Sequence, residues 1–218
     1  MSISVQKSPA RRGRPRAYDP ETALAQAMGR FWNAGYSATS LDDLSAATGM
    51  NRPSLYGAFG DKRQLYRTLL HRYRGIARAG MKDALRYDLP LREALRRVYH
   101  SALALYLPRD AAARGCFLIG TAVTESVLNR EVRTNLAEGL DEIDDAFEAR
   151  LRFARERGEL PRSSDPAALA SMASAALYSL AIRSRSGSSR AALLRIVESA
   201  LDLICATKKR ARRKGAST

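Results

Sequence analysis

Residues 39–65 read T-S-L-D-D-L-S-A-A-T-G-M-N-R-P-S-L-Y-G-A-F-G-D-K-R-Q-L, and this stretch decides the fold of the N-terminal part. Ser40 is placed to N-cap a short helix whose apolar residues recur at helical spacing, and Gly49 supplies the left-handed residue that ends it. Asn51 then caps a second short helix. Two short helices joined by a glycine turn are typical of a helix-turn-helix, which lays its second helix in the major groove of DNA.

An earlier helix completes a three-helix head. Asp19 and Pro20 carry its N-cap and first-turn signals, and Gly35 closes it. The side chains expected to form its buried stripe follow helical spacing: Ala23, Leu24, Ala27, Met28, Phe31 and Trp32.

Two patterns in the head resemble a known family. One is F-W-N-A-G-Y-S-A-T-S at residues 31–40. The other is L-Y-x-x-F-x-x-K, carried by Leu55, Tyr56, Phe59 and Lys62. Over about residues 18–66 the chain resembles the TetR family of one-component transcriptional repressors. The resemblance implies a DNA-binding head followed by a larger helical domain that holds a small-molecule effector and forms a homodimer.

The rest of the chain reads as helix after helix with almost no strand alternation, so the predicted fold class is all-α. Helices are expected over about residues 62–85 and 91–107, and a nearly all-apolar one over 115–128 should be central to the second domain. In the first of these, the residues expected to face inward are Leu65, Leu69, Tyr73 and Ile76. A long helix ended by Gly158 follows, and the last two helices begin after Asp165 and Gly187.

Four segments are therefore predicted. A disordered basic arm spans residues 1–18, and the helix-turn-helix DNA-binding domain spans 19–66. The helical effector-binding and dimerisation domain spans 67–206, and a basic tail spans 207–218.

The net charge of +15 is concentrated at the two ends of the chain. Residues 1–18 hold five basic residues and no acidic one, and residues 207–218 hold six basic residues. Such blocks suit a phosphate backbone, although the C-terminal block can equally serve solubility alone. Within Arg-Gly-Arg-Pro-Arg at residues 12–16, which resembles an AT-hook, Arg14 and Arg16 are expected to enter a narrow minor groove.

Several classes of protein are disfavoured by composition. No uninterrupted apolar stretch approaches the roughly 18 residues of a membrane-spanning helix, and the N-terminus lacks a signal-peptide pattern, so we expect a cytoplasmic protein without a membrane partner. Cys116 and Cys205 lie far apart and suggest reduced thiols. With only two histidines and no Cys-x-x-Cys pair, neither a metal site nor a cofactor is expected. No nucleophile elbow or phosphate loop appears, so catalytic residues are not expected and an enzyme is the least favoured class.

The first turn of the second helix-turn-helix helix supplies the expected base contacts. Arg52 is directed at guanine, Ser54 at a base edge, and Pro53 is tolerated because first-turn N–H groups have no intrahelical partner. Gly57 removes side-chain bulk on the same face, which allows close approach to DNA.

Other residues of the head are expected to contact phosphates. Tyr56 occupies the tyrosine position of the motif, which the resemblance makes a phosphate contact. Lys62, at the N-terminus of the next helix, is expected to hold phosphate with the help of that helix's dipole. Thr39 and Ser40 are candidates for hydroxyl–phosphate bonds.

The resemblance also implies an effector cavity lined by the helices that follow the head. The candidate lining residues are Tyr99, Leu103, Tyr106, Cys116, Phe117, Thr121, Glu125 and Tyr178. The stripe at positions 99, 103 and 106 fits plain core packing as well. Glu125, an acid on an apolar helix, fits either an arginine partner or a cationic or hydroxylated ligand.

Cys116 has a second possible role. A helix N-terminus and the nearby Arg114 would lower the pKa of its thiol and let it sense oxidants or electrophiles, as in a few members of the resembled family. The alternative is a small buried hydrophobe.

The last two helices carry the expected dimer surface, and the alternative is that they complete the core of one subunit. Their apolar residues are Leu169, Met172, Leu177 and Leu180 in the first, and Leu193, Leu194, Val197, Leu201 and Ile204 in the second. A dimer with one recognition helix per subunit would read an inverted repeat. The favoured function is a repressor released from a palindromic operator by a small molecule, and the alternative is a nonspecific, nucleoid-associated architectural protein.

Overall fold

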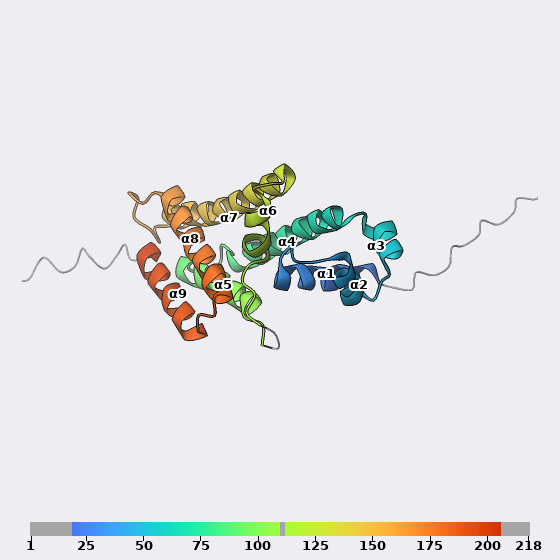
Figure 1. Cartoon of the computed structure of the whole chain (residues 1–218). Coiled ribbons are helices and arrows are strands. Elements are labelled where there is room, and N and C mark those ends of the chain that lie inside the picture. Colours follow the sequence, from blue (N-terminus) through green and yellow to red (C-terminus); the bar gives the residue numbers. More distant parts are fainter. Residues whose placement is uncertain (1–18, 110–111, 206–218) are drawn as a thin grey trace, which may run out of the picture.

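The computed structural model describes residues 19–109 and 112–205, and in these ranges the regular structure is helical throughout, without a strand. Figure 1 shows an elongated molecule with a small head at one end and the last two helices at the opposite end. The predicted all-α architecture is confirmed. Within the described residues, no helix has the length and apolarity needed to cross a membrane. The arm over 1–18 and the tail over 207–218 lie outside the described residues.

The head consists of α1 (Pro20–Ala34), α2 (Leu41–Thr48) and α3 (Arg52–Phe59), and α4 (Lys62–Ala84) leads away from it. The body adds α5 (Leu91–Tyr106), a π-helical turn (Leu118–Ala122), α6 (Val123–Glu125), α7 (Arg130–Glu156), α8 (Pro166–Arg185) and α9 (Arg190–Cys205).

Short polar side chains begin each helix of the head, as predicted. Asp19 accepts a hydrogen bond from the N–H of Thr22, and Ser40 forms a reciprocal capping box with Asp43. The amide oxygen of Asn51 accepts from the N–H of Ser54 at 2.9 Å. Gly49, at φ 66°, takes the left-handed conformation that lets the chain turn sharply between α2 and α3. The helix-turn-helix geometry is therefore set by contacts between near neighbours in sequence.

Helix α4 joins the head to the body as one continuous element (Figure 1). The boundary predicted at residue 66 falls within it. Trp32 of α1 packs edge-on against Tyr73 of α4, with ring centroids 5.2 Å apart, and its centroid lies 5.4 Å from that of Phe117. The aromatic side chains thus form a single core that continues from the head into the body.

Two expectations about burial were wrong. Ile76 is 51% exposed, because it lies at the rim of a cavity rather than against another helix. Residues 115–128 do not form one central helix: a π-helical turn and the short α6 replace it, and Leu128 at its end is 93% exposed. Its first half is central as predicted, since Phe117 and Leu118 are buried.

The last two helices begin where predicted, but most of their large apolar residues serve the subunit core. The buried ones are Leu177, Leu180, Leu193, Val197, Leu201 and Ile204. Met172 and Ile182 of α8 and Leu203 of α9 remain exposed, at 56%, 58% and 70%. These helices therefore complete the core of the subunit, and three of their apolar side chains stay exposed.

Candidate functional site

Helix α3 presents one open face at the end of the head. Leu55 is buried beneath it, whereas Arg52, Ser54 and Tyr56 are exposed. Gly57 is exposed too, and no atom lies within 4 Å of the position that a Cβ would take there. This face carries a cation, a hydroxyl and a site of close approach, which are groups that read and fit a DNA groove. Pro53, in the same first turn, is exposed as well.

Arg52 is held by an acid in the free protein. Its Nε and Nη2 donate to the two carboxylate oxygens of Asp42, at 2.9 and 2.6 Å. Both side chains are largely exposed, so the pair is weak and the guanidinium can leave it for a stronger acceptor. The predicted base contact therefore requires a change of partner.

The two hydroxyls expected at phosphates differ in access. Thr39 does not fit that role, because it is fully buried and its hydroxyl donates to the backbone oxygen of Gly35 at 2.7 Å. Ser40 is exposed, but its hydroxyl belongs to the capping box that begins α2. A phosphate contact by Ser40 would compete with that cap.

Lys62 begins α4 as predicted, yet it is half-buried. Its ammonium lies 4.3 Å from the centroid of the Tyr36 ring, a cation–π contact. Burial lowers the pKa of this lysine, and the neighbouring carboxylates of Glu125 and Asp43 act in the opposite direction. Tyr56, at 47% exposure, is the more open of the two predicted phosphate contacts.

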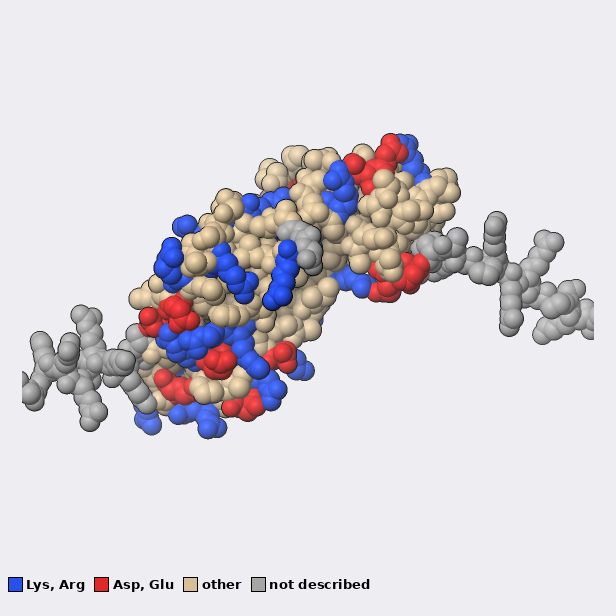
Figure 2. Space-filling model, turned by 90° about the horizontal axis from the view of Figure 1, so that it is seen from below, with Lys and Arg blue, Asp and Glu red and all other residues tan. Residues whose placement is uncertain are grey.

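The folded head is close to electrically neutral. Residues 19–66 include five acidic and four basic residues. Figure 2 shows both signs at the head end of the molecule and mixed over the body. Since phosphate binding needs Lys and Arg, the positive charge available to the head is concentrated in the adjoining residues 1–18. Arg14 and Arg16 belong to this segment, which lies outside the described residues.

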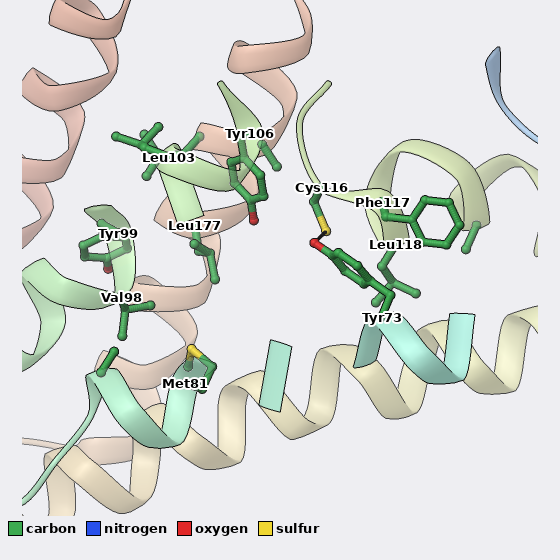
Figure 3. Packing of buried hydrophobic residues seen from close by; sticks show 14 of the residues in the cluster. Tyr73, Met81, Val98, Tyr99, Leu103, Tyr106, Cys116, Phe117, Leu118 and Leu177 are labelled. Atoms are coloured by element: carbon green, nitrogen blue, oxygen red, sulfur yellow. Dashed lines mark hydrogen bonds between the residues drawn. The ribbon is translucent and has the colours of Figure 1, made fainter. Parts of the chain in front are cut away.

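The body contains a cavity of about 460 Å³ between α4, α5, α7, α8 and the start of the π-helical segment. Its size is that of a small-molecule site. Figure 3 shows Val98, Met81 and Leu177 on one side of this space, and the Tyr73–Cys116 pair on the other. The lining is mainly apolar, with charged side chains contributed by Arg74, Arg78, Lys82, Glu142 and Arg150.

Of the predicted effector residues, Tyr106 and Cys116 line this cavity. The others lie outside its lining: Tyr99, Leu103, Phe117, Thr121, Glu125 and Tyr178. The hydroxyl of Tyr99 donates to the backbone oxygen of Ala173, which fits the core packing that the sequence left open. Glu125 accepts a 2.6 Å hydrogen bond from Ser37, so it joins body to head and lies outside the cavity lining. Among the described residues it pairs with no arginine.

The thiol of Cys116 is not the activated group that its position suggested. Burial raises the pKa of Cys116, against the smaller opposing effect of backbone N–H groups at the helix start. The Tyr73 hydroxyl donates to its sulfur at 3.2 Å, and Tyr106 is hydrogen-bonded to it as well. Arg114 stacks on the Trp32 ring at 4.0 Å instead of meeting the thiol. The expected lowering of the pKa is wrong because desolvation outweighs the helix N-terminus.

Three segments meet beside Cys116 of the cavity lining: the end of α1, the residues before the π-helical turn, and the end of α8. The indole N–H of Trp32 donates to the backbone oxygen of Gly115 at 3.0 Å. Arg185, at the end of α8, donates to the backbone oxygens of Trp32 at 2.9 Å and of Arg114 at 3.2 Å. Gly115 has φ +64°, and a Cβ there would lie 2.4 Å from the oxygen of Ala181, so this joint has no room for a side chain. The cavity residue Cys116 is thus one residue away from a direct contact with α1.

Comparison with known proteins identifies the family. Residues 23–69 match the pattern described as bacterial regulatory proteins, tetR family, and residues 92–200 match the tetracyclin repressor-like C-terminal domain. The chain is 32% identical over 192 residues to the HTH-type transcriptional repressor ComR of Escherichia coli (strain K12), covering 88% of this chain and 91% of that protein. The chain belongs to the TetR family.

Two further similarities fit this assignment. The HTH-type transcriptional repressor BdcR of Escherichia coli (strain K12) is 36% identical over 107 residues, which cover 49% of this chain and 54% of BdcR. A cysteine mutant of the TetR family regulator CifR, solved in complex with 26-bp operator DNA, superimposes with a TM-score of 0.75 at 32% identity, covering 87% of this chain and 98% of that chain. The protein is a helix-turn-helix transcriptional regulator.

The sequence analysis missed most of the cavity lining, including Arg74, Met81, Glu142 and Arg150. Of these, Arg150 is buried on the same helix as the predicted apolar seam. A signal for it exists, since it lies three residues after Phe147 and therefore on the apolar seam of α7.

Proposed function

We propose that this TetR-family regulator is a homodimeric repressor that binds an inverted-repeat operator through α3 and leaves it when a small molecule occupies the body cavity. The open face of α3 carries this proposal, because its cation, hydroxyl and glycine stand on a rigid, capped helix at the tip of the molecule. As a repressor of its own or neighbouring promoters, the protein would act in the cytoplasm.

Within this proposal the residues of the head divide into two groups. Arg52 and Ser54 read base edges. Gly57 and Pro53 present little side-chain bulk, so that the DNA can approach α3 closely. Tyr56, Lys62 and Ser40 hold phosphates, and Arg14 and Arg16 of the arm enter the flanking minor groove. The near-neutral head makes the arm the main source of salt-dependent affinity.

Dimerisation through α8 and α9 would place two copies of α3 on one operator. Met172 and Ile182 of α8 and Leu203 of α9 remain exposed apolar side chains after the subunit core is complete. Exposed apolar side chains of this kind are typical of surfaces that a second subunit covers. Two-fold symmetry then matches the inverted repeat.

The joint at Trp32 suggests how an effector would act. A ligand in the cavity touches Tyr73 and Cys116, and the segment that starts at Gly115 is hydrogen-bonded to α1. If the ligand favours a different placement of this segment, the spacing of the two recognition helices changes and operator affinity falls. By linkage, operator DNA must weaken effector binding by the same factor.

The architectural alternative draws on the basic residues at both chain ends. It predicts similar affinity for every AT-rich duplex, and the base-reading groups of α3 favour the specific repressor instead.

Footprinting of the full-length protein on the promoter nearest its gene tests the proposal. We expect one symmetric protected region, and a preference of at least about a thousandfold over a duplex of equal composition with scrambled half-sites. Scrambling a single half-site provides the control for symmetry. Equal affinity for all three duplexes at physiological salt would establish the architectural alternative.

A further inference from the structure

Arg150 of α7 is a fully buried cation on the cavity wall. Its side chain is 1% exposed, and the residue is part of the cavity lining. Its Nη2 donates to the backbone oxygen of Leu89 at 2.6 Å. Its Nε and Nη1 are buried and have no hydrogen-bond partner among the residues that the structure describes. A guanidinium stays charged and carries donors on all three nitrogens, so an incomplete set of acceptors around it is unusual inside a protein.

The nearest carboxylate compensates this charge only in part. Glu159 lies 3.6 Å from Nη2 of Arg150, beyond a good hydrogen bond. Its other oxygen accepts from the N–H of Leu91 at 2.6 Å, which holds the carboxylate at the start of α5. Within the described residues, Nε and Nη1 therefore lack an acceptor. Because both atoms are buried, an acceptor carried by a ligand would have to enter the cavity wall beside Arg150.

The other charged side chains on the cavity wall do not supply an acceptor for Arg150. Arg74 is paired with Glu138 and Glu142, both at 2.6 Å, and Arg78 lies 3.5 Å from Glu142. Glu142 is thus shared by two arginines, and their proximity lowers its pKa. Among the cavity-lining residues that the structure describes, Arg150 is the one with buried polar atoms lacking a partner.

We infer that the effector is an organic monocarboxylate whose anion binds Arg150 and whose apolar part fills the cavity. This inference rests on the proposed function, since it names the chemical class that the same cavity takes. A carboxylate oxygen supplies the missing acceptor and the missing charge together. Apolar lining such as Val98, Met81 and Leu177 suits the hydrocarbon part of such an acid (Figure 3).

A structural role for Arg150 predicts something different. Through Leu89 it also anchors the loop between α4 and α5, so its removal would lower stability whether or not a ligand binds. The relative affinity for an acid and for its neutral amide separates the two roles. If Arg150 only holds the loop and does not contact the ligand, the acid and the amide should bind alike.

Calorimetry on the full-length protein in the absence of DNA provides the test. Three probe acids, hexanoate, octanoate and phenylacetate, are each compared with the matching primary amide. We expect at least one acid to bind about tenfold or more tightly than its amide. Arg150→Met should abolish that preference, and Arg150→Lys, which keeps the positive charge, should retain part of it.

Ala146→Phe serves as the location control, since it fills the cavity and leaves Arg150 in place; it should weaken both members of each pair. The inference is overturned if no acid binds wild type at millimolar concentration, or if acids and amides bind alike. A preference that persists in Arg150→Met overturns it as well, and the wild-type comparison stands even if a variant fails to fold. Operator binding is measured separately, so failure of the repressor proposal would appear there and not in the calorimetry.

Discussion

The head and the body of this protein are both helical, but their functional groups are positioned in different ways. The exposed face of α3 depends on caps three residues apart, such as Asn51 to Ser54, and on one glycine turn. The cavity collects side chains from positions as far apart as Tyr73 and Leu177. A DNA-reading surface can therefore be specified locally, whereas a ligand site in a helical body needs long-range packing.

The two regions meet at Trp32, and replacing it should have the largest effect. Trp32→Ala removes a 4%-exposed ring that contacts Tyr73, Phe117 and the backbone of Gly115. We expect a loss of about 3–5 kcal/mol in the free energy of unfolding, measured by urea denaturation. Trp32→Phe is the matched control: it keeps most of the packing and should cost about 1 kcal/mol for the lost N–H bond. Equal, small losses would mean that the head and body are energetically independent.

Arg52 tests whether the exposed face of α3 reads sequence. Arg52→Ala should weaken operator binding by about 1–3 kcal/mol and relax the preference at one position of each half-site. Binding to a library of single-base operator variants measures both. Arg63→Ala, which removes an exposed charge at the start of α4, is the control and should weaken all sequences alike. An unchanged preference in Arg52→Ala would show that the bases are read elsewhere.

Asp42 should have the smallest effect, and an opposite sign. Asp42→Asn frees Arg52 from its 2.6 Å ion pair, so operator affinity should rise by up to about 1 kcal/mol, more at low salt. Glu21→Gln is the matched control, because it also removes an exposed acid paired with an arginine, Arg72, on a different helix. A similar gain in both variants would indicate that the gain comes from removing a carboxylate that repels the DNA phosphates, and not from the release of Arg52. Electrophoretic mobility shifts at two salt concentrations make this measurement.

Local patterns predicted the helix starts and the exposed face of α3, because caps and turns involve residues a few positions apart. Burial was harder to predict. Thr39 was expected at a phosphate, but its hydroxyl satisfies the end of α1. Glu125 was expected near the cavity, but the break into a π-helical turn and α6 leaves it beside Ser37 of the head. Neither partner is visible in helical periodicity, since both depend on how separate segments meet.

By itself the sequence determined the helical fold class, the helix-turn-helix with its caps, and the family. Each of these follows from residue types spaced a few positions apart, and such spacing can be read directly from the sequence. Only the tertiary structure decided which side chains surround the cavity. It also decided that the Cys116 thiol is desolvated with a raised pKa, and that Arg150 is buried with two donors that lack a partner among the described residues. Burial and partner choice are properties of three-dimensional packing, because the desolvation of a charge depends on every segment that surrounds it.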